Sequence, residues 1–98
     1  MYIPDELSEL AHEYEFLAYA VEDTKSHSFS CPSFWRSPVD AVRNFESSCI
    51  AQSVAKEGLL FTHPDDYYFC VIGGFDTSTG LLTPCQPIRI ESPLDADR

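Results

Sequence analysis

The side chains best suited to chemistry form a short aromatic and basic cluster in the first half of the chain. Phe34 and Trp35 directly precede Arg36, while Lys25 lies in the polar turn before them and Arg43 follows on a predicted helix. Exposed aromatic rings beside cations form stacking platforms for single-stranded nucleic acid, and a guanidinium group can hold a phosphate through two hydrogen bonds. The more common arrangement, which the sequence also allows, buries both rings in the core and pairs Arg43 with a carboxylate of its own helix. These five residues are the candidate nucleic-acid site.

A second polar group, the His-Pro-Asp-Asp run at residues 63–66, contains three possible metal ligands. His and Asp side chains can share an ion, but Asp beside Pro more often forms a turn in which the carboxylate accepts backbone N–H bonds. No nucleophile is marked near this run, and Gly73-Gly74 lacks the Lys and the helix start of a phosphate loop. The cysteines form no C-x-x-C pair, so neither a zinc site nor a dithiol centre is indicated. We therefore expect reduced thiols, no enzyme activity and no cofactor.

The charge of the chain is strongly negative and concentrated near its start. The formal net charge is −10, and the segment up to Asp23 contains seven acidic residues and no Lys or Arg. A protein of this charge repels phosphate at long range, because nucleic-acid affinity arises mostly from Lys and Arg displacing counterions. The simplest role for the charge is solubility. The alternative is an acidic face that binds a basic partner, made of Asp5, Glu6, Glu9 and Glu13.

Apolar spacing and turn residues predict the elements that position these groups. An amphipathic helix is expected over residues 4–14, and Ser37-Pro38 begins a second helix that runs to about residue 56. The predicted strands and turns are, in order, an apolar strand over 16–21, an irregular strand over 28–35 that Pro32 confines to an edge or a bulge, a central strand over 67–76 with a bulge at its two glycines, and a turn over 76–80. A return strand starts over 81–84, and Pro84 and Pro87 keep it short or at an edge; one further strand is expected over 88–90. We expect the second helix to bury an apolar face, with Phe45 meeting Ile72 on the sheet; this face consists of Val39, Val42, Phe45, Cys49, Ile50 and Val54.

These elements predict a single α+β domain, since 98 residues fit one hydrophobic core. A small antiparallel sheet of three to five strands carries one main helix on a face, with the short acidic N-terminal helix beside it. The expected divisions are an acidic helical extension over residues 1–15, the α+β domain over 16–90 and a loose polar tail over 91–98. No apolar run is long enough to span a membrane, and no basic stretch precedes an apolar core, so we expect an intracellular protein. Exposed sheet edges could support a homo-oligomer.

A series of short motifs connects these elements. It runs from Pro32 and Phe34 through Ser37-Pro38, Asp40-Ala41, Arg43 and Phe45 to His63-Pro64-Asp65-Asp66-Tyr67, Ile72-Gly73, Phe75-Asp76 and Thr79-Gly80. In order and spacing the series resembles the small nonstructural protein of gokushovirus-type microviruses, which are small single-stranded DNA bacteriophages. The resemblance covers about residues 16–90, and its most specific part is the block from Pro-Asp-Asp-Tyr through Phe-Asp to Thr-Gly. The acidic extension over residues 1–15 and Trp35 depart from the family pattern.

The resemblance implies a nonstructural accessory protein that is made in the cytoplasm of the infected bacterial host and is absent from the virion. It implies a role in single-stranded DNA genome replication or packaging, with single-stranded DNA or the replication and packaging proteins as partners. DNA binding is commonly presumed for such proteins, and no catalytic residue is implied. The acidic extension supports a different hypothesis, an adaptor or inhibitor whose DNA-like acidic face binds a basic host or viral protein. Oligonucleotide binding at low salt discriminates between the two.

Overall fold

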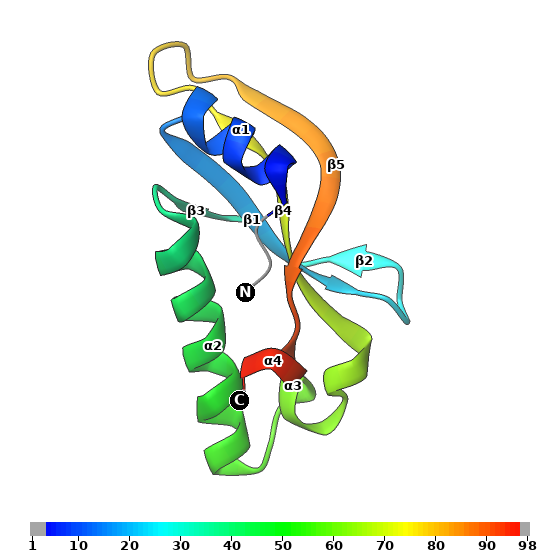
Figure 1. The fold of residues 1–98 in the computed structure, drawn as a ribbon. Helices are drawn as coiled ribbons and strands as arrows, with labels where there is room; N and C mark the ends of the chain where they lie inside the picture. Colours follow the sequence, from blue (N-terminus) through cyan, green and yellow to red (C-terminus); the bar gives the residue numbers. More distant parts are fainter. Residues whose placement is uncertain (1–3, 97–98) are drawn as a thin grey trace.

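The structure, a computed structural model, describes residues 4–96 and contains a five-stranded antiparallel sheet with helices packed on one of its faces (Figure 1). The strand order is β2-β1-β4-β5, and the short β3 also pairs with β1. The predicted α+β class and antiparallel sheet are therefore confirmed. In chain order the elements are α1 (Asp5–Glu13), β1 (Phe16–Asp23), β2 (Ser28–Phe29), β3 (Ser33–Trp35), α2 (Pro38–Ala55), α3 (Leu59–Thr62), the 3-10 turn η1 (Pro64–Asp66), β4 (Tyr67–Phe75), β5 (Leu82–Glu91) and α4 (Pro93–Ala96).

The two central strands, β1 and β4, pair along their whole lengths. Their register shifts between Ala18 and Tyr19, because β4 inserts Ile72 as a bulge. A Cβ atom on Gly73 would lie 2.5 Å from the carbonyl oxygen of Thr83 on β5, so the close approach of the two strands requires glycine there. The bulge predicted at the two glycines is present one residue earlier, at Ile72.

The two edges of the sheet tolerate proline in different ways. The return strand lies at an edge of the sheet, which is one of the two alternatives that its prolines predict. The separate strand expected over 88–90 is wrong, because β5 is one long strand whose pairing with β4 contains two register shifts. Pro84 and Pro87 fit within it because an edge strand has one side without ladder hydrogen bonds. On the other edge, β2 and β3 both pair with β1 and are separated by the segment that contains Pro32. The predicted irregular edge strand is confirmed.

The main helix begins and ends where its terminal residues predict. The Ser37 hydroxyl accepts the N–H of Asp40 at 3.4 Å, Pro38 occupies the first turn, and Lys56 ends the helix with a left-handed backbone (φ 56°). Helices α1 and α2 pack on the same face of the sheet and share one core. Its buried members are Leu7, Leu17, Tyr19, Ala41, Val42, Phe45, Cys49, Phe69, Val71 and Ile90.

The buried stripe of α2 is narrower than predicted. Val39, Ile50 and Val54 were expected in the core, but their side chains are 45%, 49% and 79% exposed. At 3.6 residues per turn Val54 lies nearly opposite the line through Phe45 and Cys49, which is the line that contacts the sheet, while Val39 and Ile50 lie about 100–120° around the helix from that line.

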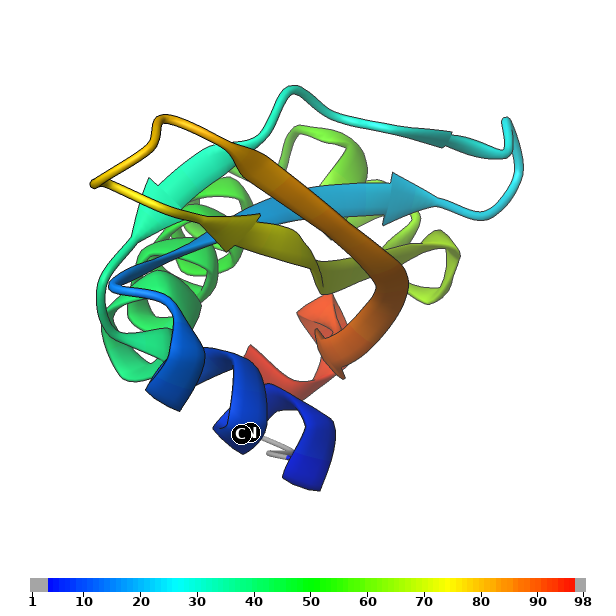
Figure 2. The ribbon, with the colours of Figure 1, turned by 90° about the horizontal axis from the view of Figure 1, so that it is seen from above.

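No helix of residues 4–96 packs on the second face of the sheet, and we call this the open face. Ile72 was predicted to meet Phe45, but Phe45 stacks on Phe69 instead, and Ile72 lies on the open face. Figure 2 shows α1 and α2 on one side of the strands and the other side bare. Successive residues of a strand point to opposite faces, so β1 and β4 supply side chains to both.

The C-terminal segment is more ordered than predicted. The loose tail expected over 91–98 is wrong for its described part, because β5 continues to Glu91, Pro93 is buried and α4 packs beside α2 and η1 (Figure 1). Among the described residues, no helix is long and apolar enough to cross a bilayer.

Candidate functional site on the open sheet face

The open face is hollowed at the end where β1 begins. Phe16 and Phe75 are paired across β1 and β4, and Phe34 on β3 meets Phe75 edge to face at a ring-centroid distance of 5.9 Å. With Leu82 they line an apolar hollow of about 340 Å³. A neighbouring hollow of about 350 Å³ shares Phe34 and Leu82 and extends the apolar surface over Ile72. We call the first hollow the aromatic pocket; an open, apolar site of this kind suits a flat ring better than a charged group.

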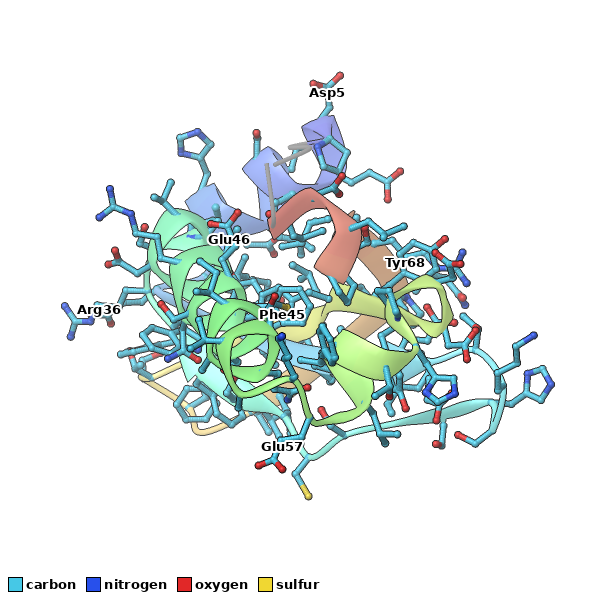
Figure 3. The ribbon with its side chains drawn as sticks, turned by 90° about the horizontal axis from the view of Figure 1, so that it is seen from below. Asp5, Arg36, Phe45, Glu46, Glu57 and Tyr68 are labelled. Atoms are coloured by element: carbon cyan, nitrogen blue, oxygen red, sulfur yellow. The ribbon has the colours of Figure 1, made fainter. Side chains whose placement is uncertain are left out.

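An ion pair lies at the rim of the aromatic pocket. The Arg36 guanidinium stands 4.9 Å from the centre of the Phe16 ring, and its Nη2 lies 3.0 Å from Oε1 of Glu15. The Thr77 hydroxyl donates to the other carboxylate oxygen, Oε2, at 3.1 Å. The side chain of Arg36 is 70% exposed and projects outward in Figure 3. A cation is therefore available beside the rings, and it already holds a carboxylate.

A second ion pair lies at the far end of the open face. Arg89 donates to both carboxylate oxygens of Glu22 at 2.9 and 3.0 Å and lies 4.2 Å from the centre of the Tyr68 ring. This double hydrogen bond lowers the pKa of Glu22 below its ordinary value. The neighbouring Cys70 thiol, 3.7 Å from Glu22, has its pKa raised to about 12 by burial and by that carboxylate. Cys70 is thus a protonated structural thiol and not a nucleophile.

The structure separates the five residues of the predicted nucleic-acid site. Phe34 lies opposite Ala18 on the open face, whereas Trp35 lies opposite Leu17 and packs against the core on the helix side. The indole N–H of Trp35 donates to Ser33 at 3.2 Å. The two neighbouring rings therefore cannot form one platform, because consecutive strand residues face opposite ways.

The three predicted cations also lie apart. Arg36 is at the pocket rim, but Lys25 is in the turn that follows β1, at the opposite end of that strand, where its backbone N–H donates to the Asp23 carboxylate at 3.0 Å. Arg43 is exposed on α2, which covers the other face. Of the predicted set, the structure brings Phe34 and Arg36 to one place. It adds Phe16, Phe75 and Leu82, which the sequence signalled only through strand alternation at the ends of β1, β4 and β5.

The four carboxylates of the predicted acidic face are all on α1, which lies on the helix-covered side of the sheet. Helix α1 packs through the buried Leu7, and the side chains of its four predicted carboxylates are exposed. In Figure 3 Asp5 projects away from the body of the domain. Since α1 shares the core of the covered face, this helix and its negative charge are separated from the aromatic pocket by the sheet.

The remaining polar groups form turns and a carboxyl pair of which one member is buried. His63 precedes the 3-10 turn that contains Asp65 and Asp66, and within residues 4–96 no group of three or more His, Cys, Asp or Glu side chains gathers as a metal site. The four cysteines, Cys31, Cys49, Cys70 and Cys85, form no disulfide. Sequence reasoning missed Glu91, whose side chain is only 4% exposed at the end of β5. Burial, and then its hydrogen bond with the Glu46 carboxyl of α2, raise the pKa of Glu91 to about 7.

The molecule is thus an α+β domain in which one sheet face is covered by helices and the other exposes an aromatic pocket beside an arginine. A family model described as Phage ORF5 protein matches residues 16–96, and the chain belongs to this family. The matched range contains every residue of the aromatic pocket and leaves out α1 and Glu15. Neither the curated proteins nor the solved structures contain a match to this chain. The phage part of the resemblance noted from the sequence is therefore confirmed.

Proposed function

We propose that this chain is a non-enzymatic, nonstructural accessory protein of a microvirus-type phage that binds single-stranded DNA during genome replication or packaging. Membership of a phage protein family supports the phage setting. The observation that carries the proposal is the aromatic pocket on a bare sheet face, with Arg36 packed on one of its rings.

The physical case rests on stacking. Each base stacked on an aromatic side chain contributes about 1–3 kcal/mol, and the interaction tolerates any sequence because every base has a flat π-face. Sheet faces that carry aromatic residues bind unpaired bases of nucleic acid in this way. Phe16, Phe34 and Phe75 offer such a surface here.

The charge distribution limits the affinity. Within residues 4–96, the open face carries two arginines, Arg36 and Arg89, and each already forms an ion pair with a carboxylate. With so few phosphates neutralised, the dependence of affinity on salt should be shallow, with a slope on the order of −1 to −2 on logarithmic axes. The acidic α1 lies on the helix side of the sheet, which reduces its repulsion of a strand bound on the open face.

Fluorescence anisotropy with a labelled oligodeoxythymidine of about 16 nucleotides, at low salt, tests the proposal; this length covers the site sizes of known single-strand binders. Phe34→Ala should weaken binding, because it removes a ring of the pocket. Phe61→Ala on α3 is the matched control, since Phe61 is 39% exposed against 43% for Phe34 and does not line the pocket. An unlabelled duplex should compete poorly, because its bases are already stacked. Equal loss in both variants, or no binding by the wild-type protein, would contradict the proposal.

A second candidate function is an acidic adaptor or inhibitor of a basic host or viral protein, because α1 presents Asp5, Glu6, Glu9 and Glu13 to solvent. Replacing these four by Asn or Gln should then abolish capture of the partner from infected cells and leave oligonucleotide affinity nearly unchanged.

The nonstructural role also predicts that mass spectrometry detects the chain in infected cells and not in purified virions.

A further inference from the structure

Glu15 holds Arg36 at the rim of the aromatic pocket, and both of its oxygens are engaged. Oε1 accepts from Arg36, which follows β3, and Oε2 accepts from Thr77 in the turn between β4 and β5. The Glu15 carboxylate, just before β1, therefore connects the residue after β3 with the turn between β4 and β5. The pairing fixes the guanidinium over the Phe16 ring, which itself lines the pocket.

A nucleotide has a flat apolar base and an anionic phosphate, and the site offers a place for each. The pocket of about 340 Å³ is lined by apolar side chains and one glycine, which suits a base. The group beside it that can hold an anion is Arg36. A phosphate and a carboxylate present the same arrangement of oxygens to a guanidinium group.

We infer that Glu15 occupies the position of a DNA phosphate, so that the aromatic pocket and Arg36 form one nucleotide subsite from which Glu15 must be displaced. The inference rests on the proposed function, since it assigns the ligand of that same surface. Displacement is feasible because the two side chains are 70% and 46% exposed and exposed ion pairs are weak. Glu15 thereby sets both the affinity for single strands and its dependence on salt.

The salt dependence follows from counting charges. When a phosphate takes Arg36 from Glu15, the released carboxylate attracts a cation from solution, which offsets the counterion that the DNA gives up. Without the carboxylate no such offset occurs. Each neutralised phosphate of a single strand contributes about −0.7 to the logarithmic salt slope, so removing Glu15 should steepen the slope by about that amount.

The test compares Glu15→Gln with Glu13→Gln by anisotropy with the same labelled oligodeoxythymidine over a series of salt concentrations. Glu13 is the matched control, because it is exposed at the end of α1 and its substitution changes the net charge by the same amount. We expect Glu15→Gln to bind several-fold more tightly than Glu13→Gln and to show the steeper slope. The gain should vanish in the double variant Glu15→Gln/Arg36→Gln. Thr77→Val, which removes the hydroxyl that holds Oε2, should give a smaller gain in the same direction.

Three results overturn the inference. Equal affinities for Glu15→Gln and Glu13→Gln would assign the effect to general charge repulsion. A gain that persists without Arg36 would show that the carboxylate acts elsewhere. In both cases the proposed function still holds if the wild-type protein binds the oligonucleotide and Phe34→Ala does not. Absence of binding by the wild-type protein and by every variant removes the proposed function together with the subsite.

Discussion

The two faces of the central sheet are built from the same strands, yet one is filled and the other is hollow. On the helix side, Phe45 stacks on Phe69 at 4.8 Å and Phe69 stacks on Tyr19 at 5.3 Å, which forms a column of three nearly parallel rings. On the open face, Phe34 touches Phe75 only at its edge and both rings line a pocket. Aromatic content alone does not distinguish these faces. What differs is whether a helix covers the rings.

The two faces also differ in how their charged side chains are arranged. Each ion pair on the open face joins one cation to one carboxylate, with Arg36 holding Glu15 and Arg89 holding the half-buried Glu22. The helix side carries the exposed carboxylates of α1 and a carboxyl pair made of the buried Glu91 and the half-buried Glu46. The ion pairs of the open face therefore add no net charge to it, while the excess negative charge of α1 lies on the other side of the sheet. Under the proposed function, a single strand of DNA would bind the face with the smaller negative charge.

Phe45→Ala should produce the largest effect on stability. Its side chain is 4% exposed and lies between α2 and the sheet, directed into the interior in Figure 3. Removing a buried phenyl ring costs about 3–5 kcal/mol, from lost burial and the cavity that remains. This is comparable to the whole free energy of unfolding of many small domains. Urea denaturation followed by circular dichroism measures the change, and an unchanged midpoint would contradict the ring column as the centre of the core.

The Glu46–Glu91 pair predicts that stability falls as the pH rises toward neutrality. Burial holds the pKa of Glu91 near 7 in the folded chain, whereas an exposed glutamate titrates near 4.5. Between pH 4.5 and 7 this glutamate is ionised in the unfolded chain and still protonated in the folded one, so raising the pH favours unfolding. Its contribution to the free energy of unfolding is complete below pH 4.5 and is lost as the pH rises through about 7. The expected loss is on the order of 1–3 kcal/mol. Glu46 on α2 and Asp95 on α4 are the acidic neighbours that oppose ionisation.

Glu91→Gln isolates this contribution, because the amide keeps the shape of the side chain and cannot ionise. Its free energy of unfolding should fall less than that of the wild-type protein between pH 5 and 8, measured by urea titration at each pH. Glu57→Gln, in the exposed turn after α2, is the matched control and should follow the wild-type curve (Figure 3). Parallel curves for all three proteins would show that Glu91 titrates like an exposed carboxyl.

Tyr19→Phe should stabilise the protein slightly. The Tyr19 hydroxyl is buried, and within residues 4–96 it makes no hydrogen bond; burial also raises its pKa to about 12. A buried hydroxyl without a partner carries a desolvation cost that phenylalanine removes, so we expect a gain of about 1 kcal/mol. Tyr68→Phe on the open face is the control and should change little. Destabilisation by Tyr19→Phe in thermal melts would indicate that the hydroxyl has a partner in solution.

Local signals in the sequence predicted most of the fold. Ser37 and Pro38 begin α2, the apolar run of β4 forms the central strand, and Pro32 interrupts the edge strand. These features depend on a few neighbouring residues and on alternation, both of which the sequence displays. The continuity of β5 was not settled by the sequence, because Pro84 and Pro87 are compatible both with a short strand and with a longer strand at an edge, and only the assembled sheet shows that β5 is an edge strand.

The site was predicted less well than the fold, for a physical reason. Phe34 and Trp35 are adjacent in sequence and looked like one platform, but in a strand they face opposite ways. The residues that do share a site with Phe34 come from the beginning of β1, the end of β4 and the beginning of β5. Sequence patterns do not show which of two sheet faces the helices will cover, so the exposed set emerges only from the assembled fold.

Phe34→Ala should have the smallest effect on stability, although it replaces the same residue type as Phe45→Ala. The Phe34 side chain is 43% exposed and its ring contact is the edge of Phe75. Loss of one edge-to-face pair on an exposed surface costs about 0.5–1 kcal/mol. Urea denaturation should thus place its midpoint close to that of the wild-type protein.

Because Phe34→Ala should change stability so little, its effect on binding can be measured in a folded protein. If the open face binds single strands, Phe34→Ala yields a protein that is folded and nearly as stable but binds the oligonucleotide weakly. If Phe34→Ala instead destabilises the chain as much as Phe45→Ala, the open face must be buried in solution. Sedimentation over a range of protein concentrations would then show whether a second copy covers it, because such an interface makes stability depend on concentration. A monomer with an unchanged midpoint supports the open face as a surface kept for another molecule.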